Sequence, residues 1–505
     1  MNIQIFSRRK IESRSILYLI IPLILSTYTH LWNPTGFPSI HVDEGHYLRK
    51  AISTEEGKGF QPQNRYLAPY FAQIFLAGVF KIIGFPYFLN LNQDSVQDLY
   101  LVPRLIMGVL AVIDTLLVYK IAENRYGRNV ALIASVLFAV MPVGWMTRRI
   151  LLESIQLPFI LTSILLALYI GNHKGNLKLS IVMSGIFLGL AIFTKIPAFT
   201  LIPLIGAVIF FNTRKLKFVV LWLIPVILIP SLWPIHAASI GDFKEWVHGI
   251  QYQTNRESRP LINALNTFFQ IDPILFSLGM AGLLYSIIKR DYFLITWVLS
   301  LLIFLQLIGY VASFHIISLL PPFCLLGGRL LNGIGSNLRI AGKSDLLPMV
   351  RLAAISIFGI ISISMLISID LNSTYYKALG FIVKELPSNN VSSTIANDQK
   401  VTLVGNPQYF WIPEFVFQRS FDDKSYYSSS SFDSKNYLMI MDKGFLDRLT
   451  DKTGHWQRFA IAYNATHSIA KYEQNLTGDI DTTKYPFTNL KLTPETKFVD
   501  IRSNY

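Results

Sequence analysis

The chain has 505 residues, of which 52% are hydrophobic and 15% are charged, with a formal net charge of +14. This balance excludes an ordinary soluble globular protein, in which roughly a quarter of the residues are charged. The positive charge does not indicate nucleic-acid binding, because the cations lie in short turns between apolar runs, as the positive-inside rule describes for membrane proteins. A single cysteine, Cys324, excludes an intramolecular disulfide.

The first apolar run, 16–32, follows a basic segment and lacks a small-residue cleavage site, so we expect a retained membrane helix. Ten later runs are also long enough to cross a bilayer as helices. The sequence therefore predicts about eleven transmembrane helices. The predicted spans are 16–32, 100–121, 129–146, 153–170, 179–194, 196–211, 217–234, 271–288, 292–312, 315–333 and 348–369.

The charges in the loops predict which side each loop faces. Lys and Arg flank the turns near residues 120–128, 174–178, 214–217, 289–290 and 339–343, so these turns and the N-terminus should be cytoplasmic. That assignment requires an even number of crossings before residue 122. We therefore expect the apolar stretch 67–89 not to cross, but to lie at the outer leaflet within one long external loop, 33–99.

The C-terminal part, 370–505, is far more polar than the rest of the chain and contains short strand-like runs. The topology above places it outside the cytoplasm. Four glycosylation sequons, beginning at Asn372, Asn390, Asn464 and Asn475, agree with that placement. The sequence thus predicts a transmembrane domain, 1–369, followed by a small extracytoplasmic α/β domain, 370–505.

An unusually ionisable segment, "SIHVDEGHYLRK", follows the first predicted span. Asp43 suits a helix N-cap, so we expect a short interfacial helix over Glu44–Thr54. Glu44 then lies in the first turn, where the helix dipole favours an anion, and Tyr47 lies one turn further on. A simple capped interfacial helix with no catalytic role explains these local features equally well.

Further ionisable residues are predicted on the same side of the membrane. Charged side chains at the ends of membrane helices cost free energy unless they are paired or hydrated. Such residues are therefore candidates for a functional site. A surface ion pair at a helix end and a structural histidine are the simpler alternatives. The additional candidates are Arg104, Arg148, Arg149, Glu153, Lys195 and His315.

This one-sided set fits a reaction in which a lipid phosphate is the leaving group. Arginine binds phosphate through two parallel hydrogen bonds, and cations stabilise the charge that develops on a leaving group. A carboxylate such as Asp43 can remove the proton of an acceptor hydroxyl. The sequence therefore predicts a general base and a cationic phosphate site at the outer membrane surface.

The order of these motifs resembles the GT-C superfamily of integral membrane glycosyltransferases over roughly residues 10–335. The most similar branch holds the dolichyl-phosphate-mannose–protein mannosyltransferases and the bacterial aminoarabinose–lipid A transferases. The motifs that carry the resemblance are Asp43-Glu44-Gly45-His46-Tyr47, a proline-containing amphipathic segment at Tyr66–Gly84, Arg104, Arg149-Ile-Leu-Leu-Glu153, "GLAIFTKIPAFTLIP" and "SFHIISLLPPFCLL".

The resemblance implies an inverting glycosyltransferase that takes a sugar from a polyprenyl phosphate. It implies that Asp43 is the essential acid and that Glu44 supports it. It further implies that Arg149, with Arg148, contacts the donor phosphate. Arg104 and Lys195, the other external cations, are predicted to bind the phosphate as well. The remaining supporting residues are Tyr47, His46, Glu153 and His315. No cofactor is certain, but a divalent metal is a candidate, with Asp43, Glu44, His41 and His46 as its potential ligands.

Other functions remain open at this point. A polytopic transporter or a flippase for lipid-linked sugars would place charges deep in several spans, where Asp114 is the main acid. A non-catalytic anchor or scaffold is a third hypothesis, and transfer of a whole oligosaccharide is a variant of the enzyme hypothesis. The favoured prediction is a multi-pass enzyme of the cytoplasmic membrane. Its expected partners are a polyprenyl-phosphate sugar, membrane lipid and a protein or glycolipid acceptor, not nucleic acid.

Overall fold

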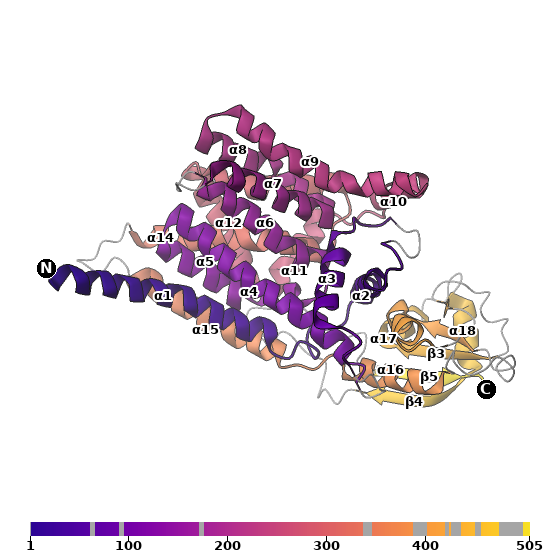
Figure 1. Ribbon diagram of the computed structural model, residues 1–505. Helices are drawn as coiled ribbons and strands as arrows, with labels where there is room; N and C mark the ends of the chain where they lie inside the picture. Colours follow the sequence, from indigo (N-terminus) through magenta and orange to yellow (C-terminus); the bar gives the residue numbers. More distant parts are fainter. Residues whose placement is uncertain are drawn as a thin grey trace.

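Long apolar helices form a bundle, and a smaller α/β unit lies at one end of it (Figure 1). The termini of the described chain lie at opposite ends of the molecule (Figure 1). This computed structural model describes residues 2–60, 66–89, 95–170, 176–336, 346–386, 401–419, 424–425, 436–449, 456–473 and 498–505.

The bundle and the helices around it occupy the first three-quarters of the chain. The α-helices are α1 (Asn2–Leu31), α2 (Val42–Glu55), α3 (Phe71–Ile83), α4 (Asp98–Tyr126), α5 (Arg128–Val140), α6 (Leu152–Tyr169), α7 (Leu177–Thr194), α8 (Ile202–Thr213), α9 (Leu216–Ser239), α10 (Phe243–Thr254), α11 (Leu261–Ile271), α12 (Pro273–Ile288), α13 (Tyr292–Ile308), α14 (Leu320–Ser336) and α15 (Leu346–Ile367). Three short 3₁₀ segments are η1 (Pro142–Arg148), η2 (Ile196–Leu201) and η3 (Ser313–Leu319).

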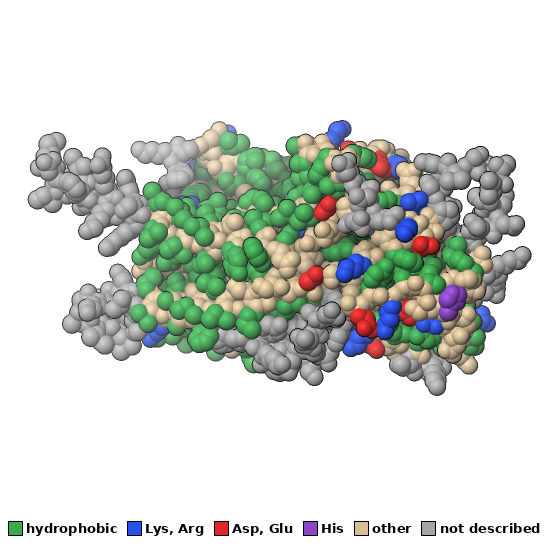
Figure 2. Space-filling model, turned by 90° about the horizontal axis from the view of Figure 1, so that it is seen from below, with side chains coloured by type: hydrophobic (Ala, Val, Ile, Leu, Met, Phe, Trp, Pro, Cys, Tyr) green, Lys and Arg blue, Asp and Glu red, His purple; other side chains and the backbone are tan. Residues whose placement is uncertain are grey.

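The polytopic helical class is confirmed. Among the described residues, seven helices are long and apolar enough to cross a membrane, and two bent helix pairs would raise the number to nine. Each of the eleven predicted runs contains such a helix, a bent pair or a shorter apolar helix. The count of eleven crossings therefore stays a prediction. Figure 2 shows a broad hydrophobic face over the bundle, with most of the visible charged side chains gathered toward one end.

The apolar stretch 67–89 contains only the 13-residue helix α3. At a rise of about 1.5 Å per residue, such a helix is about 20 Å long, whereas a bilayer core is about 30 Å thick. The helix packs against α2. Its length therefore agrees with the prediction that this stretch does not cross.

One predicted span is not straight. The run 129–146 bends by 68° between α5 and η1. Met141 is extended, and Pro142 follows it; a residue before proline avoids the helical region, so the helix ends there. The bend turns η1 across the end of the bundle, where it contacts η3. Two segments far apart in the sequence thereby meet at the end that carries the candidate site.

The C-terminal unit is a small α/β domain, as the sequence predicts. Its sheet has five strands in the order β2-β1-β3-β5-β4, with parallel pairing around β1 and antiparallel pairing around β5. The strands are β1 (Thr402–Gly405), β2 (Lys424–Ser425), β3 (Tyr437–Asp442), β4 (His467–Glu473) and β5 (Phe498–Ser503). The helices are α16 (Ser373–Glu385), α17 (Lys443–Leu449) and α18 (Trp456–Asn464), with a short π-helical turn, η6, at Ile412–Val416.

The apolar core continues from the membrane-side helices into this domain. Leu48 of α2 and Tyr100 of α4 belong to one buried cluster with Trp411 and the strand residue Ile440. The indole N–H of Trp411 donates to the Tyr100 hydroxyl at 3.0 Å. The boundary between 1–369 and 370–505 stays a prediction, because packing alone does not separate the two parts.

One of the four sequons is inaccessible in the folded protein. Asn372 is fully buried. Its side-chain oxygen accepts from the Ile40 amide at 3.0 Å, and its amide donates to the carbonyls of Thr35, Gly36 and Pro38. The side chain holds the loop before α2 and is inaccessible in the folded protein. Asn464 is exposed at the end of α18, whereas Asn390 and Asn475 lie outside the described residues.

Candidate functional site

Helix α2 begins two residues earlier than the sequence predicts, and its N-cap is His41 rather than Asp43. The His41 ring nitrogen Nδ1 accepts from the Asp43 amide at 3.3 Å, while the Glu44 carboxylate accepts from the His41 amide at 2.9 Å. This reciprocal capping box satisfies two backbone donors. The expected cap at Asp43 is therefore wrong, and the Asp43 side chain, 40% exposed, is released from that task.

Glu44 is completely buried and forms an ion pair with Arg104. Its Oε2 accepts from Arg104 Nε at 3.0 Å and its Oε1 from Nη2 at 2.8 Å, so the contact is bidentate. The amide of Ile150 also donates to Oε2, at 3.2 Å. Burial by itself would raise the pKa of Glu44, but Arg104 outweighs it and holds the pKa below its ordinary value. Glu44 therefore joins α2 to α4 and to the segment before α6.

Arg104 makes further hydrogen bonds inside the protein. Nη1 donates to the carbonyls of Pro34 and Pro38, at 2.8 and 2.9 Å, and the side chain is fully buried. In this arrangement the guanidinium holds the loop before α2 against α4. The phosphate contact expected of Arg104 from the sequence stays a prediction, and it would require the Glu44 pair to open.

Arg148 is buried as well, with 1% of its surface exposed. Its guanidinium donates to the Trp32 carbonyl and lies 5.8 Å from the Phe37 ring. The side chain thus fixes the end of α1 and the loop that follows it. Like Arg104, its side chain is enclosed within the protein, and the phosphate contact expected of it stays a prediction.

Arg149 lies nearer the surface and points toward the loop before α2. Its Nη2 donates to the carbonyl and hydroxyl oxygens of Ser39, at 3.0 and 2.9 Å, and its guanidinium lies 5.0 Å from the Trp145 ring. The next residue, Ile150, is hydrogen-bonded to Glu44. Arg149 and Asp43 therefore belong to the same end of the bundle, as the sequence predicts.

A second group of ionisable side chains lies at the start of α6. Glu153, 3% exposed, forms an ion pair with Lys195, the residue at the break between α7 and η2. Gln156, one turn further along α6, donates to the Lys195 carbonyl at 2.5 Å and holds this break in place. The sequence predicted these residues on one side, and the structure brings them into contact.

His315 of η3 joins this group from the other side. Its Nδ1 accepts from the Ala312 amide at 3.1 Å, which leaves Nε2 to carry the ring proton. Nε2 lies 3.8 Å from a Glu153 oxygen. The neighbouring Phe314 ring lies 4.7 Å from the Lys195 ammonium. A small pocket is lined by Glu153, Gln156, Lys195, Pro197, Leu301, Leu305, His315, Ser318 and Leu319.

Tyr47 connects α2 to this group. Burial, with the negative charges of Asp43 and Glu153, raises the pKa of Tyr47 well above its ordinary value. The phenol therefore stays protonated and can act as a hydrogen-bond donor. The side chain of Arg256 opposes this shift, so it lies close enough to influence Tyr47. Asp43, Tyr47, Glu153 and Arg256 thus form one electrostatic neighbourhood.

Arg256 was not among the residues predicted for the site. It follows α10, and its guanidinium lies 4.9 Å from the Tyr310 ring. The neighbouring Arg259 pairs through its backbone with Tyr310, which ties this loop to the segment before η3. The sequence could have indicated this residue. Arg256 and Arg259 lie in a segment that the predicted topology places outside the cytoplasm, where arginines are less common than in cytoplasmic loops.

The four candidate metal ligands do not form a metal site as a group. Glu44 is enclosed by Arg104 and two backbone amides. His41 uses Nδ1 to cap α2. His46 lies beside Tyr47, with ring centroids 5.9 Å apart. Within the described parts of the chain, no group of three or more His, Cys, Asp or Glu side chains is arranged to hold a metal ion.

Comparisons with known proteins agree with this geometry. Residues 81–235 match the family model "Dolichyl-phosphate-mannose-protein mannosyltransferase", a region that includes Arg149, Glu153 and Lys195. No curated protein sequence matches the chain. Solved structures share its fold, including the following two.

One of them is the archaeal oligosaccharyltransferase AglB from Archaeoglobus fulgidus, in complex with an inhibitory peptide and a dolichol-phosphate. It has a TM-score of 0.56 and 12% identity over 92% of this chain and 74% of AglB. The other is ArnT from Cupriavidus metallidurans bound to undecaprenyl phosphate, with a TM-score of 0.54 and 13% identity over 97% of this chain and 98% of ArnT.

The chain has the fold of the GT-C glycosyltransferases. At identities this low the two structures establish the fold alone, while the family match adds the link to the mannosyltransferase branch. The resemblance found in the sequence is therefore confirmed. The family match and the GT-C fold together support a membrane-bound glycosyltransferase, and leave its donor and acceptor to be identified.

Proposed function

We propose that this GT-C protein is an inverting glycosyltransferase that moves one sugar from a polyprenyl phosphate to an acceptor on the outer side of the cytoplasmic membrane. The observation that carries the proposal is the meeting of α2, α6, α7 and η3 at one end of the bundle. There the partly exposed carboxylate of Asp43 lies close enough to Glu153 to influence its charge, and Glu153 in turn contacts Lys195 and His315. The lipid phosphates in the AglB and ArnT complexes support a lipid-linked donor.

In this proposal Asp43 is the general base. One of its oxygens takes the proton of the acceptor hydroxyl as that oxygen bonds to the anomeric carbon of the sugar. The bond from this carbon to the phosphate oxygen breaks at the same time, and its electron pair leaves with the polyprenyl phosphate. A single displacement of this kind inverts the anomeric configuration. Asp43 suits the role because His41, not Asp43, caps the helix.

Three cations are placed to receive the phosphate. Lys195 has 18% of its side chain exposed and already neighbours Glu153, Arg149 lies at the loop before α2, and Arg256 lies near Tyr47. Positive charge at the leaving group lowers the barrier most when it is fixed before the reaction. Gln156 fixes the backbone at Lys195, and Ser39 fixes the guanidinium of Arg149. Glu44 and Arg104 hold α2 in place and do not touch the donor in this proposal.

Purified protein in lipid nanodiscs provides the test. Incubation with polyprenyl-phosphate sugars and candidate acceptors should give a glycosylated product and release an equal amount of polyprenyl phosphate. Nuclear magnetic resonance of the product should show the opposite anomeric configuration to the donor. Retention of configuration would contradict single displacement. Movement of the lipid-linked sugar across sealed vesicles, with no product for any acceptor, would instead favour a flippase.

A further inference from the structure

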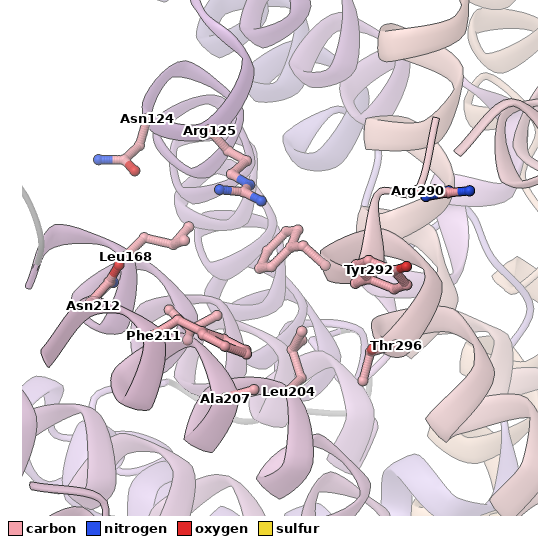
Figure 3. Close-up of a pocket in the computed structure, with 12 residues that line it drawn as sticks. Asn124, Arg125, Leu168, Leu204, Ala207, Phe211, Asn212, Arg290, Tyr292 and Thr296 are labelled. Carbon is pink, nitrogen blue, oxygen red and sulfur yellow. The ribbon is translucent and has the colours of Figure 1, made fainter. Parts of the chain in front are cut away.

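A sizeable cavity lies away from the proposed active site. It has a volume of about 520 Å³ and lies between the ends of α4, α6 and α8 and the start of α13. Figure 3 shows the side chains around it, with the Arg125 guanidinium directed toward its centre. Along α4, 21 residues separate Arg104 from Arg125, which places them about 30 Å apart. The cavity therefore opens at the opposite end of the bundle.

The lining combines apolar walls with two cations. Leu204 and Phe211 of α8 and Phe293 of α13 form part of the walls. Arg125 and Arg290 lie at its border, and the Arg125 guanidinium lies 5.7 Å from the Phe293 ring. No carboxylate lines the cavity in the part of the chain that the structure describes. An apolar cavity with cations at its edge matches an anionic amphiphile.

The nearby acids are already paired with other groups. Glu123 accepts from Lys120 at 2.9 Å and lies 3.6 Å from Arg128. These two cations therefore hold the acid that lies two residues from Arg125 in the sequence.

Asp291, the residue after Arg290, is likewise engaged. It forms an ion pair with Arg329 and accepts from the Tyr126 hydroxyl at 2.8 Å. Over the described residues, neither Arg125 nor Arg290 has an ion-pair partner within 4.0 Å. Their charge is available to a ligand.

The backbone at Arg290 makes the turn that ends α12. Its φ is +55°, in the left-handed region that follows many helix ends and that favours glycine. The amide of Asp291 closes the end of α12 by donating to the Ser286 carbonyl at 2.8 Å. Glycine would make the same turn without a Cβ, so Arg290→Gly removes the charge at a position whose backbone suits glycine.

We propose that this cavity binds the phosphate head group of an anionic membrane lipid from the leaflet opposite the Asp43 site. Basic pockets between membrane helices attract such head groups. A lipid fits better than a free anion because the walls are apolar and large apolar side chains at the entrance are exposed, including Phe211 (61%) and Tyr292 (71%). Phospholipids with a phosphate diester and polyprenyl phosphates both combine an anionic phosphate with apolar chains. The experiment below distinguishes these two sources.

The test uses the full chain in nanodiscs of phosphatidylcholine. The probes are phosphatidylglycerol, undecaprenyl phosphate and inorganic phosphate, and binding is measured by native mass spectrometry. The double variant Arg125→Gln/Arg290→Gly should bind the anionic lipids roughly tenfold or more weakly. The variant Lys178→Gln/Lys217→Gln removes the same charge from the same end at two residues that do not line the cavity, and should bind as wild type does.

The outcomes separate clearly. If only the Arg125→Gln/Arg290→Gly variant binds one of the two lipids more weakly, the proposal is supported. The lipid whose binding is lost is then the ligand class of the cavity. An equal loss of lipid binding in both double variants would overturn the proposal. The lipid would then be attracted by the overall positive charge at this end of the bundle and not by the cavity. Competition by inorganic phosphate at the same concentration as the lipid would also overturn the proposal, because the apolar walls would contribute nothing. Arg290→Gly alone should keep the wild-type Tm. Weaker lipid binding by this variant would then reflect the loss of the arginine side chain and not unfolding.

Discussion

Two neighbouring acids of α2 have opposite environments. Glu44 is completely buried, and its oxygens accept from Arg104, His41 and Ile150. Asp43 is 40% exposed and lies near Tyr47 and Glu153, at the surface where a substrate can arrive. Adjacency in sequence therefore does not imply a shared role. In this protein Glu44 holds the helix in place, and the acid before it, Asp43, is the one that we propose takes part in the reaction.

The largest expected effect on stability comes from breaking the buried ion pair. Glu44→Gln should lower the free energy of unfolding by about 3–5 kcal/mol, because Arg104 would remain buried without its counter-charge. Thermal unfolding in detergent measures the loss. Glu55→Gln, at the far end of the same helix, is the matched control and should leave Tm near the wild-type value. An unchanged Tm in Glu44→Gln would show that the pair does not hold α2.

A smaller effect should come from the contact between α2 and the C-terminal domain. A Cβ atom at Gly45 would collide with the indole of Trp411. Gly45→Ala should therefore cost about 1–3 kcal/mol and shift α2, which also carries Asp43. Gly78→Ala in α3 is the control, because a Cβ there meets no atom within 4 Å. Glycosyl transfer and Tm should both fall in Gly45→Ala. A loss of Tm in Gly45→Ala/Trp411→Ala that is smaller than the sum of the two single losses would confirm the collision.

The cations at the edge of the site should affect the donor more than the fold. Arg256→Gln should raise the KM for the polyprenyl-phosphate sugar by about tenfold, in keeping with the loss of one charge-assisted hydrogen bond, and leave Tm unchanged. Arg259→Gln is a close control, because Arg259 also lies against the Tyr310 ring, at 5.4 Å. If both variants bind donor equally well, Arg256 does not belong to the phosphate site.

The smallest effect is the pH dependence of the Glu44 contribution. Its pKa is lowered in the folded protein from an ordinary value of 4.5, so its stabilisation is complete above that value. As the pH falls through the folded-state pKa, the carboxylate is protonated and the stabilisation is lost. The difference in Tm between wild type and Glu44→Gln should therefore stay constant from about pH 7 down to about pH 4.5 and narrow below that pH. A difference that also stays constant below that pH would contradict the assigned shift.

Much of the fold could be predicted from the sequence, because apolar runs of bilayer length and turns rich in Lys and Arg report directly on membrane helices. The gathering of Asp43, Arg149, Glu153 and Lys195 at one end followed from the same topology. The break at Met141 was missed because a proline after a helix permits either a kink or a stop.

The division of roles among the charges could not be predicted. It depends on contacts across the fold, such as Arg104 with Glu44, that no spacing in the sequence reveals. The N-cap of α2 was misassigned because both His41 and Asp43 have side-chain atoms that can accept a hydrogen bond from the backbone. Glu44 is the third residue of the helix, the position from which it forms a capping box with His41. Arg256 was missed because it lies in a loop that reaches the site only through the pairing of Arg259 with Tyr310.

The most direct test is the rate of glycosyl transfer per folded molecule in Asp43→Asn, with purified protein and saturating polyprenyl-phosphate sugar. The amide has nearly the shape of the carboxylate but cannot take a proton. Transfer should fall by roughly 10²–10⁴-fold while Tm and donor binding stay at wild-type values. Transfer at the wild-type rate would show that the exposed acid of α2 is not the base.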